Sequence, residues 1–172
     1  MSVTSPYGGF DAIARSPFRV AAPPSYSLRD MPPDRVFGDA WLVILSSLKE
    51  LRGGWPTRGW SWDARQSCVA SSFSVELEDK ARAAASVALS REWTMTTIDR
   101  APSPLRELAE RTGGLREGQM LLASAPVGAA FAYALWWPWG DGMTTSARVG
   151  LGGPAVKPDD LQRLRDTFGV QL

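Results

Sequence analysis

The chain has 172 residues, a length that most simply corresponds to one domain with a buried core of its own. Its hydrophobic share of 44% is that of an ordinary globular protein, and its formal net charge of +1 argues against nucleic-acid binding driven by bulk electrostatics. Histidine is absent, which removes Ser-His and Cys-His nucleophile pairs, histidine general bases and most zinc sites.

The N-terminal residues 1–33 are predicted to form an extended arm. Prolines recur along the whole segment, and they disfavour both a long helix and a central strand. These prolines are Pro6, Pro17, Pro23, Pro24, Pro32 and Pro33. Tyr7 and Phe18 each follow a Ser-Pro pair and make the arm more apolar than a solvated tail usually is. We therefore expect the arm to lie on its own domain or on another chain, where it could join two copies of the protein.

Residues 34–172 are predicted to form a single α+β domain that begins with an amphipathic helix. Asp34 is a suitable N-cap, and the Gly53-Gly54 pair is a stop signal. The apolar residues between them recur at helical spacing. They are Phe37, Ala40, Trp41, Ile44, Leu45, Leu48 and Leu51.

A loop with three tryptophans, Trp55, Trp60 and Trp62, is predicted over residues 54–63. Such a cluster is typical of a satellite core under a loop. The alternative is an aromatic platform for a sugar, a base or the side chain of a partner.

Further elements are predicted between residues 74 and 124. A helix over 74–89 begins with Ser74 as its cap and has an alanine-rich face that requires close approach to another element. A short strand over 93–98, a helix that starts at Ser103 and a strand over 119–124 follow.

The clearest pattern is a β-hairpin over residues 129–151 with an Asp141-Gly142 turn. On its first arm large side chains alternate with alanines, so the two kinds are expected on opposite faces of the sheet. A final helix is expected to start at Pro158. The sequence thus predicts a small antiparallel sheet, a three-stranded meander with 93–98 as a candidate fourth strand, covered on one face by about four helices.

The absence of a catalytic motif favours a non-enzymatic protein that binds another protein. Trp, Tyr and Arg dominate binding hot spots, and a hairpin tip is a rigid place to present them. The predicted partner-binding residues are Trp137, Trp139, Asp141, Trp60, Trp62, Arg58, Tyr7 and Phe18. The most concrete form of this hypothesis is a bacterial immunity- or antitoxin-like neutraliser, or an assembly adaptor.

Two other functions use the same aromatic residues. A carbohydrate-binding protein or glycoside-acting enzyme would combine tryptophan platforms with Asp63 and Asp141 as the carboxylates. A nucleic-acid binder would stack bases on Trp55, Trp60, Trp62 or Trp139 beside Arg52, Arg58 and Arg65, but the basic density is modest.

No metal site or cofactor is predicted. Cys68 is the only cysteine, so it has no internal disulfide partner and is expected to be a small buried hydrophobic residue in a reducing cytoplasm. The first residues lack the basic and apolar regions of a signal peptide, and no apolar run is long enough to span a membrane.

Overall fold

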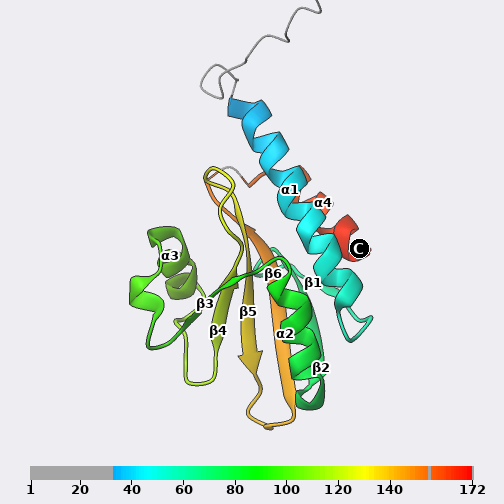
Figure 1. The fold of residues 1–172 in the computed structure, drawn as a ribbon, viewed down its shortest axis with the longest axis vertical. Helices are drawn as coiled ribbons and strands as arrows, with labels where there is room; N and C mark the ends of the chain where they lie inside the picture. Colours follow the sequence, from blue (N-terminus) through cyan, green and yellow to red (C-terminus); the bar gives the residue numbers. More distant parts are fainter. Residues whose placement is uncertain (1–32, 155, 172) are drawn as a thin grey trace, which may run out of the picture. The chain divides into compact units, whose positions relative to one another are not determined.

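The computed structural model describes residues 33–154 and 156–171 (Figure 1). Apart from Pro33, the predicted arm lies outside the described residues, and with it Tyr7 and Phe18. The boundary between arm and domain therefore stays a prediction.

The described residues contain a six-stranded sheet in which every neighbouring pair of strands is antiparallel. In spatial order the strands are β1 (Ser61–Asp63), β2 (Cys68–Ser74), β6 (Thr144–Gly152), β5 (Phe131–Pro138), β4 (Met120–Ala123) and β3 (Arg91–Thr94). The predicted meander is confirmed as β4-β5-β6, and the candidate fourth strand is β3, displaced toward the N-terminus. The sheet is larger than predicted because β1 and β2 add to it beside β6.

Four α-helices and two short 3-10 helices accompany the sheet in the described residues. They are α1 (Pro33–Gly54), η1 (Val75–Leu77), α2 (Glu78–Ser86), η2 (Ile98–Arg100), α3 (Ser103–Arg111) and α4 (Pro158–Phe168). Helix α1 lies between α2 and α4, and these three cover one face of the sheet (Figure 1). The prediction that all helices lie on one face is wrong for α3, which packs on the opposite face.

The alternation of large and small residues in β5 separates the two layers of the core. Ala132 and Ala134 face α1, α2 and α4, whereas Tyr133 and Leu135 face α3. Alanines on the first face leave room for helices to approach closely. The alanine-rich face of α2 belongs to the same buried cluster as the alanines of β5.

The α3 face becomes polar toward β1 and β2. Val69 and Phe73 of β2 point into the core beneath α1, so Ala70 and Ser72 point to the α3 face, where Ser72 is exposed. Helix α3 packs over β4 and β5, and its apolar cluster does not extend to β1 and β2. Small and polar side chains therefore form the surface of the sheet at this edge.

Candidate functional site

The turn between β5 and β6 is held by Asp141. Its carboxylate accepts hydrogen bonds from the backbone N–H of Met143 (2.9 Å), the backbone N–H of Thr144 (3.0 Å) and the Thr144 hydroxyl (2.9 Å). These hydrogen bonds lower the pKa of Asp141 below its ordinary value, and the bond from the Met143 N–H has the largest effect. The backbone N–H of Trp139 closes the hairpin on the Thr144 carbonyl at 2.7 Å. Asp141 thus fixes the shape of the turn.

Three large apolar side chains remain exposed around this fixed turn. Trp139 is 54% exposed, Met143 60% and Val75 42%. Val75 reaches the turn because its backbone N–H donates to the Met143 carbonyl at 2.9 Å, just beyond the last pairing of β2 with β6. We call Val75, Trp139 and Met143 the apolar tip.

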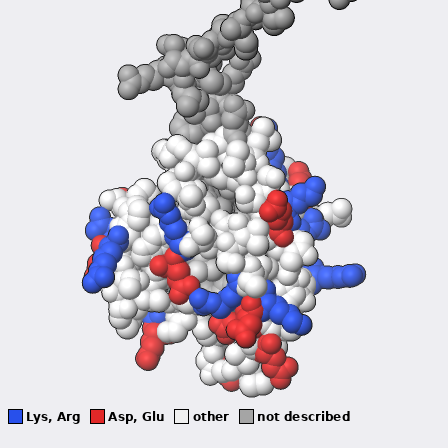
Figure 2. Space-filling model, in the orientation of Figure 1, with Lys and Arg blue, Asp and Glu red and all other residues white. Residues whose placement is uncertain are grey.

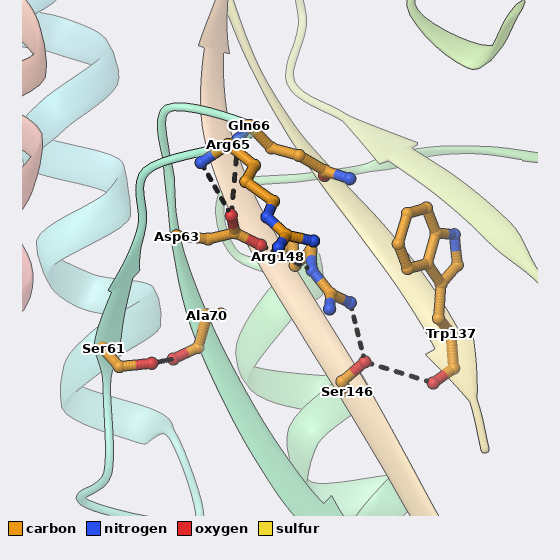
Figure 3. A network of polar contacts seen from close by, with 8 residues as sticks. All are labelled: Ser61, Asp63, Arg65, Gln66, Ala70, Trp137, Ser146 and Arg148. Atoms are coloured by element: carbon orange, nitrogen blue, oxygen red, sulfur yellow. Dashed lines mark hydrogen bonds and ion pairs between the residues drawn. The ribbon is translucent and has the colours of Figure 1, made fainter. Parts of the chain in front are cut away.

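Trp137 is half-buried on the α3 face of the sheet, two residues before Trp139. The Arg148 guanidinium lies 4.6 Å from the centroid of its ring, and Figure 3 shows Arg148 between Trp137 and Asp63. Arg148 Nε forms an ion pair with Asp63 Oδ2 at 3.2 Å, and its Nη1 donates to the Ser146 hydroxyl at 3.0 Å. Asp63 also accepts from the backbone N–H groups of Arg65 and Gln66. Asp63 and Arg148 thus neutralise each other's charge.

Trp60 and Trp62 lie on the other side of the sheet, beside α4. The Trp60 ring packs on Phe168 at 4.4 Å and on Trp55 at 4.9 Å, measured between ring centroids. Trp62 is half-buried against the same core, with the Arg165 guanidinium 5.0 Å from its ring. Arg58 is exposed in the preceding loop. The tryptophans of the loop thus pack on the main core instead of forming a separate satellite core, and Trp60, Trp62 and Arg58 are not brought together with the apolar tip.

The two carboxylates proposed for glycoside chemistry lie at opposite ends of β2. Asp63 pairs with Cys68, whereas Asp141 caps the turn at Thr144, which pairs with Ser74. A strand rises about 3.3 Å per residue, so the length of β2 separates them by roughly 20 Å. Glycosidase carboxylates stand about 5–10 Å apart. The geometry therefore gives no support to this pair.

Cys68 and Tyr133 are buried next to each other on the α3 face. Burial is the main cause that raises the pKa of Cys68 to about 12, with a further rise from Asp63 and a lowering from Arg148. Burial also raises the pKa of Tyr133, and Cys68 and Asp63 act in the same direction while Arg111 opposes them. Both groups remain protonated at neutral pH. The prediction of a buried, unpaired Cys68 is confirmed.

A hollow of about 680 Å³ opens between α3 and residues 124–129. Leu105, Leu108 and Phe131 supply much of its apolar lining, and Arg91 and Arg111 also line it. None of the described residues predicted to bind a partner contributes to this hollow.

The structure adds residues that the sequence pattern did not single out. Val75 joins the apolar tip only because β2 pairs with β6, and Arg148 meets Asp63 across 85 positions of the chain. The one available signal was the position of Met143 directly after Asp141-Gly142, which places its side chain at a turn.

The chain matches no protein-family model, no curated protein and no solved structure. Within residues 33–154 and 156–171, no three His, Cys, Asp or Glu side chains gather as ligands for a metal ion. None of the described helices has a stretch that is both long and apolar enough to cross a membrane.

Proposed function

We propose that this protein binds another protein through the apolar tip. The observation that carries the proposal is the exposure of Trp139, Met143 and Val75 around a turn whose backbone is fixed by hydrogen bonds. Large apolar side chains on a rigid support lose little conformational entropy on binding, which is how hot-spot residues obtain their affinity. The tip is therefore suited to enter an apolar pocket.

The size of the exposed side chains makes the tip sufficient as an anchor. Full burial of one large apolar side chain contributes about 2–3 kcal/mol. Trp139 and Met143 are each more than half exposed, so much of that contribution is still available to a partner. The gain is offset in part by the loss of translational and rotational freedom on association.

Charged residues near the tip indicate which charges border the apolar pocket of the partner. Glu76 lies next to Val75, Glu78 and Asp79 form the first turn of α2, and Asp141 stays ionised because its pKa is lowered. Figure 2 shows acidic side chains at the lower end of the described unit. We infer a partner whose apolar pocket is bordered by Lys or Arg, since like charges there would repel.

The remaining predicted contact residues do not belong to the apolar tip. Trp137 is half-buried beneath Arg148, and Arg58 is exposed in the loop before β1. Trp60 and Trp62 pack against the buried core, and Tyr7 and Phe18 lie outside the described residues. An immunity- or antitoxin-like neutraliser, or an assembly adaptor, is the form of partner-binding protein that we propose.

The test is co-purification of the tagged full chain from a lysate of its own organism. We expect one protein to be retained in stoichiometric amount by the wild type. Trp139→Ala should lose it, and Met143→Ala should weaken its retention, because both substitutions remove apolar area from the tip.

Leu42→Ala is the matched control, because Leu42 is 63% exposed on α1 and lies outside the tip. Circular dichroism of each variant reports whether the fold is kept. Retention of the partner by folded Trp139→Ala, or its equal loss in Leu42→Ala, would contradict the proposal. The absence of any stoichiometric partner would do the same.

A further inference from the structure

A second cavity, of about 380 Å³, lies beside the hydroxyl end of Tyr133. It opens to solvent and is bordered by the turn between β1 and β2, the C-terminal end of α3, β5 and β6, and the start of α4. We call it the Tyr133 cavity. Its polar lining comes from Arg65, Gln66, Ser67, Arg111, Thr112 and Tyr133, and its apolar lining from Leu108, Leu151, Val156 and Leu161.

Tyr133 brings a hydrogen-bond donor to this cavity. The residue is only 6% exposed, and its hydroxyl has no hydrogen-bond partner among the described residues. Because burial raises its pKa, the phenol keeps its proton at neutral pH. The phenol can therefore donate a hydrogen bond to a ligand that enters the cavity.

Two guanidinium groups line the same cavity without a carboxylate to neutralise them. Neither Arg65 nor Arg111 forms an ion pair with a described residue, and no Asp or Glu lines the cavity. Arg111 acts on the Tyr133 hydroxyl electrostatically, which places its charge near that donor. The nearby Asp63 carboxylate is already paired with Arg148. The cavity therefore has an excess of positive charge.

Gln66 adds a polar group that is also unsatisfied. Its Oε1 atom is buried and has no hydrogen-bond partner within the described chain. Figure 3 shows that the Gln66 side chain extends away from Asp63, which contacts only its backbone N–H. Rotation of the amide by 180° presents its NH2 group in place of the oxygen, so Gln66 can either accept or donate.

We propose that the Tyr133 cavity binds a small oxyanion, the carboxylate or phosphate group of a ligand. Guanidinium groups match both anions because they donate paired N–H bonds in a planar fork. The Tyr133 hydroxyl donates a further hydrogen bond, and Leu108, Leu151 and Leu161 supply apolar surface beside these donors. The inference does not rest on partner binding by the apolar tip, which lies at the other end of β6.

The test is isothermal titration of the full chain with inorganic phosphate and, separately, with acetate, at pH 7.5 and at an ionic strength held constant with sodium chloride. We expect saturable binding of at least one anion. Tyr133→Phe removes only the hydroxyl, and Arg111→Gln removes one charge. Each should weaken binding about tenfold or more, the effect of losing a charge-assisted hydrogen bond.

Arg100→Gln is the control for net charge, because Arg100 is exposed on η2 and does not line the cavity. It should bind the anion as the wild type does. The proposal is overturned if neither anion saturates, if Arg100→Gln weakens binding as much as Arg111→Gln, or if Tyr133→Phe binds normally. Binding of one anion alone assigns the ligand class to phosphates or to carboxylates.

Discussion

The ring of Tyr133 lies across Gly150 on the neighbouring strand. The two residues pair directly between β5 and β6, and a Cβ atom at Gly150 would overlap the ring and the hydroxyl of Tyr133. Phe131 covers Gly152 in the same way, two pairs further along. Glycine is required at these positions for space, so that the aromatic rings can lie flat on the sheet beneath α3.

Gly150→Ala should destabilise the protein by about 1–3 kcal/mol, the usual cost of overpacking a core. The added methyl group would push the Tyr133 ring off the sheet, toward α3. Chemical denaturation monitored by circular dichroism measures the change in the free energy of unfolding. Gly59→Ala is the control, because a Cβ there has no neighbour within 4 Å. A Gly150→Ala protein as stable as Gly59→Ala would show that Tyr133 is not confined by the glycine.

Asp141 should make the hairpin turn sensitive to acid. Its folded-state pKa is lowered, so its contribution to stability is fully present above its unfolded pKa of about 3.9 and is lost as the pH falls through the lower folded value. Melting temperatures measured from pH 7 to pH 2 should therefore converge for the wild type and Asp141→Asn, with the wild type more stable at pH 7. Asp99→Asn, an exposed aspartate on η2, should match the wild type throughout. If the melting temperatures of Asp141→Asn and Asp99→Asn depend on pH in the same way, Asp141 does not stabilise the turn.

The contributions of Arg148 and Asp63 to the free energy of unfolding should be coupled through their ion pair. Their side chains are 24% and 23% exposed, and Asp63 is further fixed by two backbone N–H groups. A double-mutant cycle with Arg148→Met and Asp63→Asn should give a coupling free energy of about 1 kcal/mol.

The pair between Arg82 and Glu92 is an internal comparison for this cycle. It is shorter, at 2.6 Å, but its side chains are 39% and 41% exposed, so solvent screens it more strongly. We expect a smaller coupling there, about 0.5 kcal/mol or less. The reverse order of the two coupling energies would mean that distance outweighs burial in this sheet.

Cys68 should be unreactive in the folded protein. Its side chain is fully buried and its pKa is raised to about 12, so almost no thiolate is present at pH 8. A disulfide reagent such as dithionitrobenzoate should label the native protein slowly and the guanidinium-unfolded protein at once. Prompt labelling of the native protein would show that the thiol reaches solvent without unfolding.

The raised pKa of Cys68 also implies a loss of stability in alkali. Its contribution is fully present below the unfolded pKa of about 8.5 and is lost as the pH rises toward about 12. Stability should therefore fall less steeply above pH 9 in Cys68→Ala than in the wild type. If the stability of both proteins falls equally steeply above pH 9, other groups cause the loss of stability in alkali.

Local sequence patterns predicted the elements whose signals lie within one segment. The helical spacing from Ala40 to Leu51 gave α1, the Asp141-Gly142 turn gave the β5-β6 hairpin, and Pro158 marked the start of α4. The alternation along β5 correctly separated the alanines from the large residues. Each of these signals depends on neighbours within a few positions, which is why it can be read from the chain.

β2 was missed because its residues alternate weakly and several are serines, which favour turns as readily as strands. Ser71 is nevertheless buried, because its hydroxyl accepts a hydrogen bond from Trp55 Nε1 at 3.1 Å. Only the pairing of β2 with β6, about 75 positions later, makes this segment a strand.

The candidate sites depend on the same long-range pairings. The sequence by itself determined Trp139, Asp141 and Met143 as neighbours on one turn, since a hairpin brings its own residues together. Val75 joins them, Arg148 reaches Asp63, and Arg65 and Arg111 reach Tyr133 only in the folded chain. Tertiary structure decided these contacts because they join separate segments, and the free energy that brings such segments together comes from burial of the core they share.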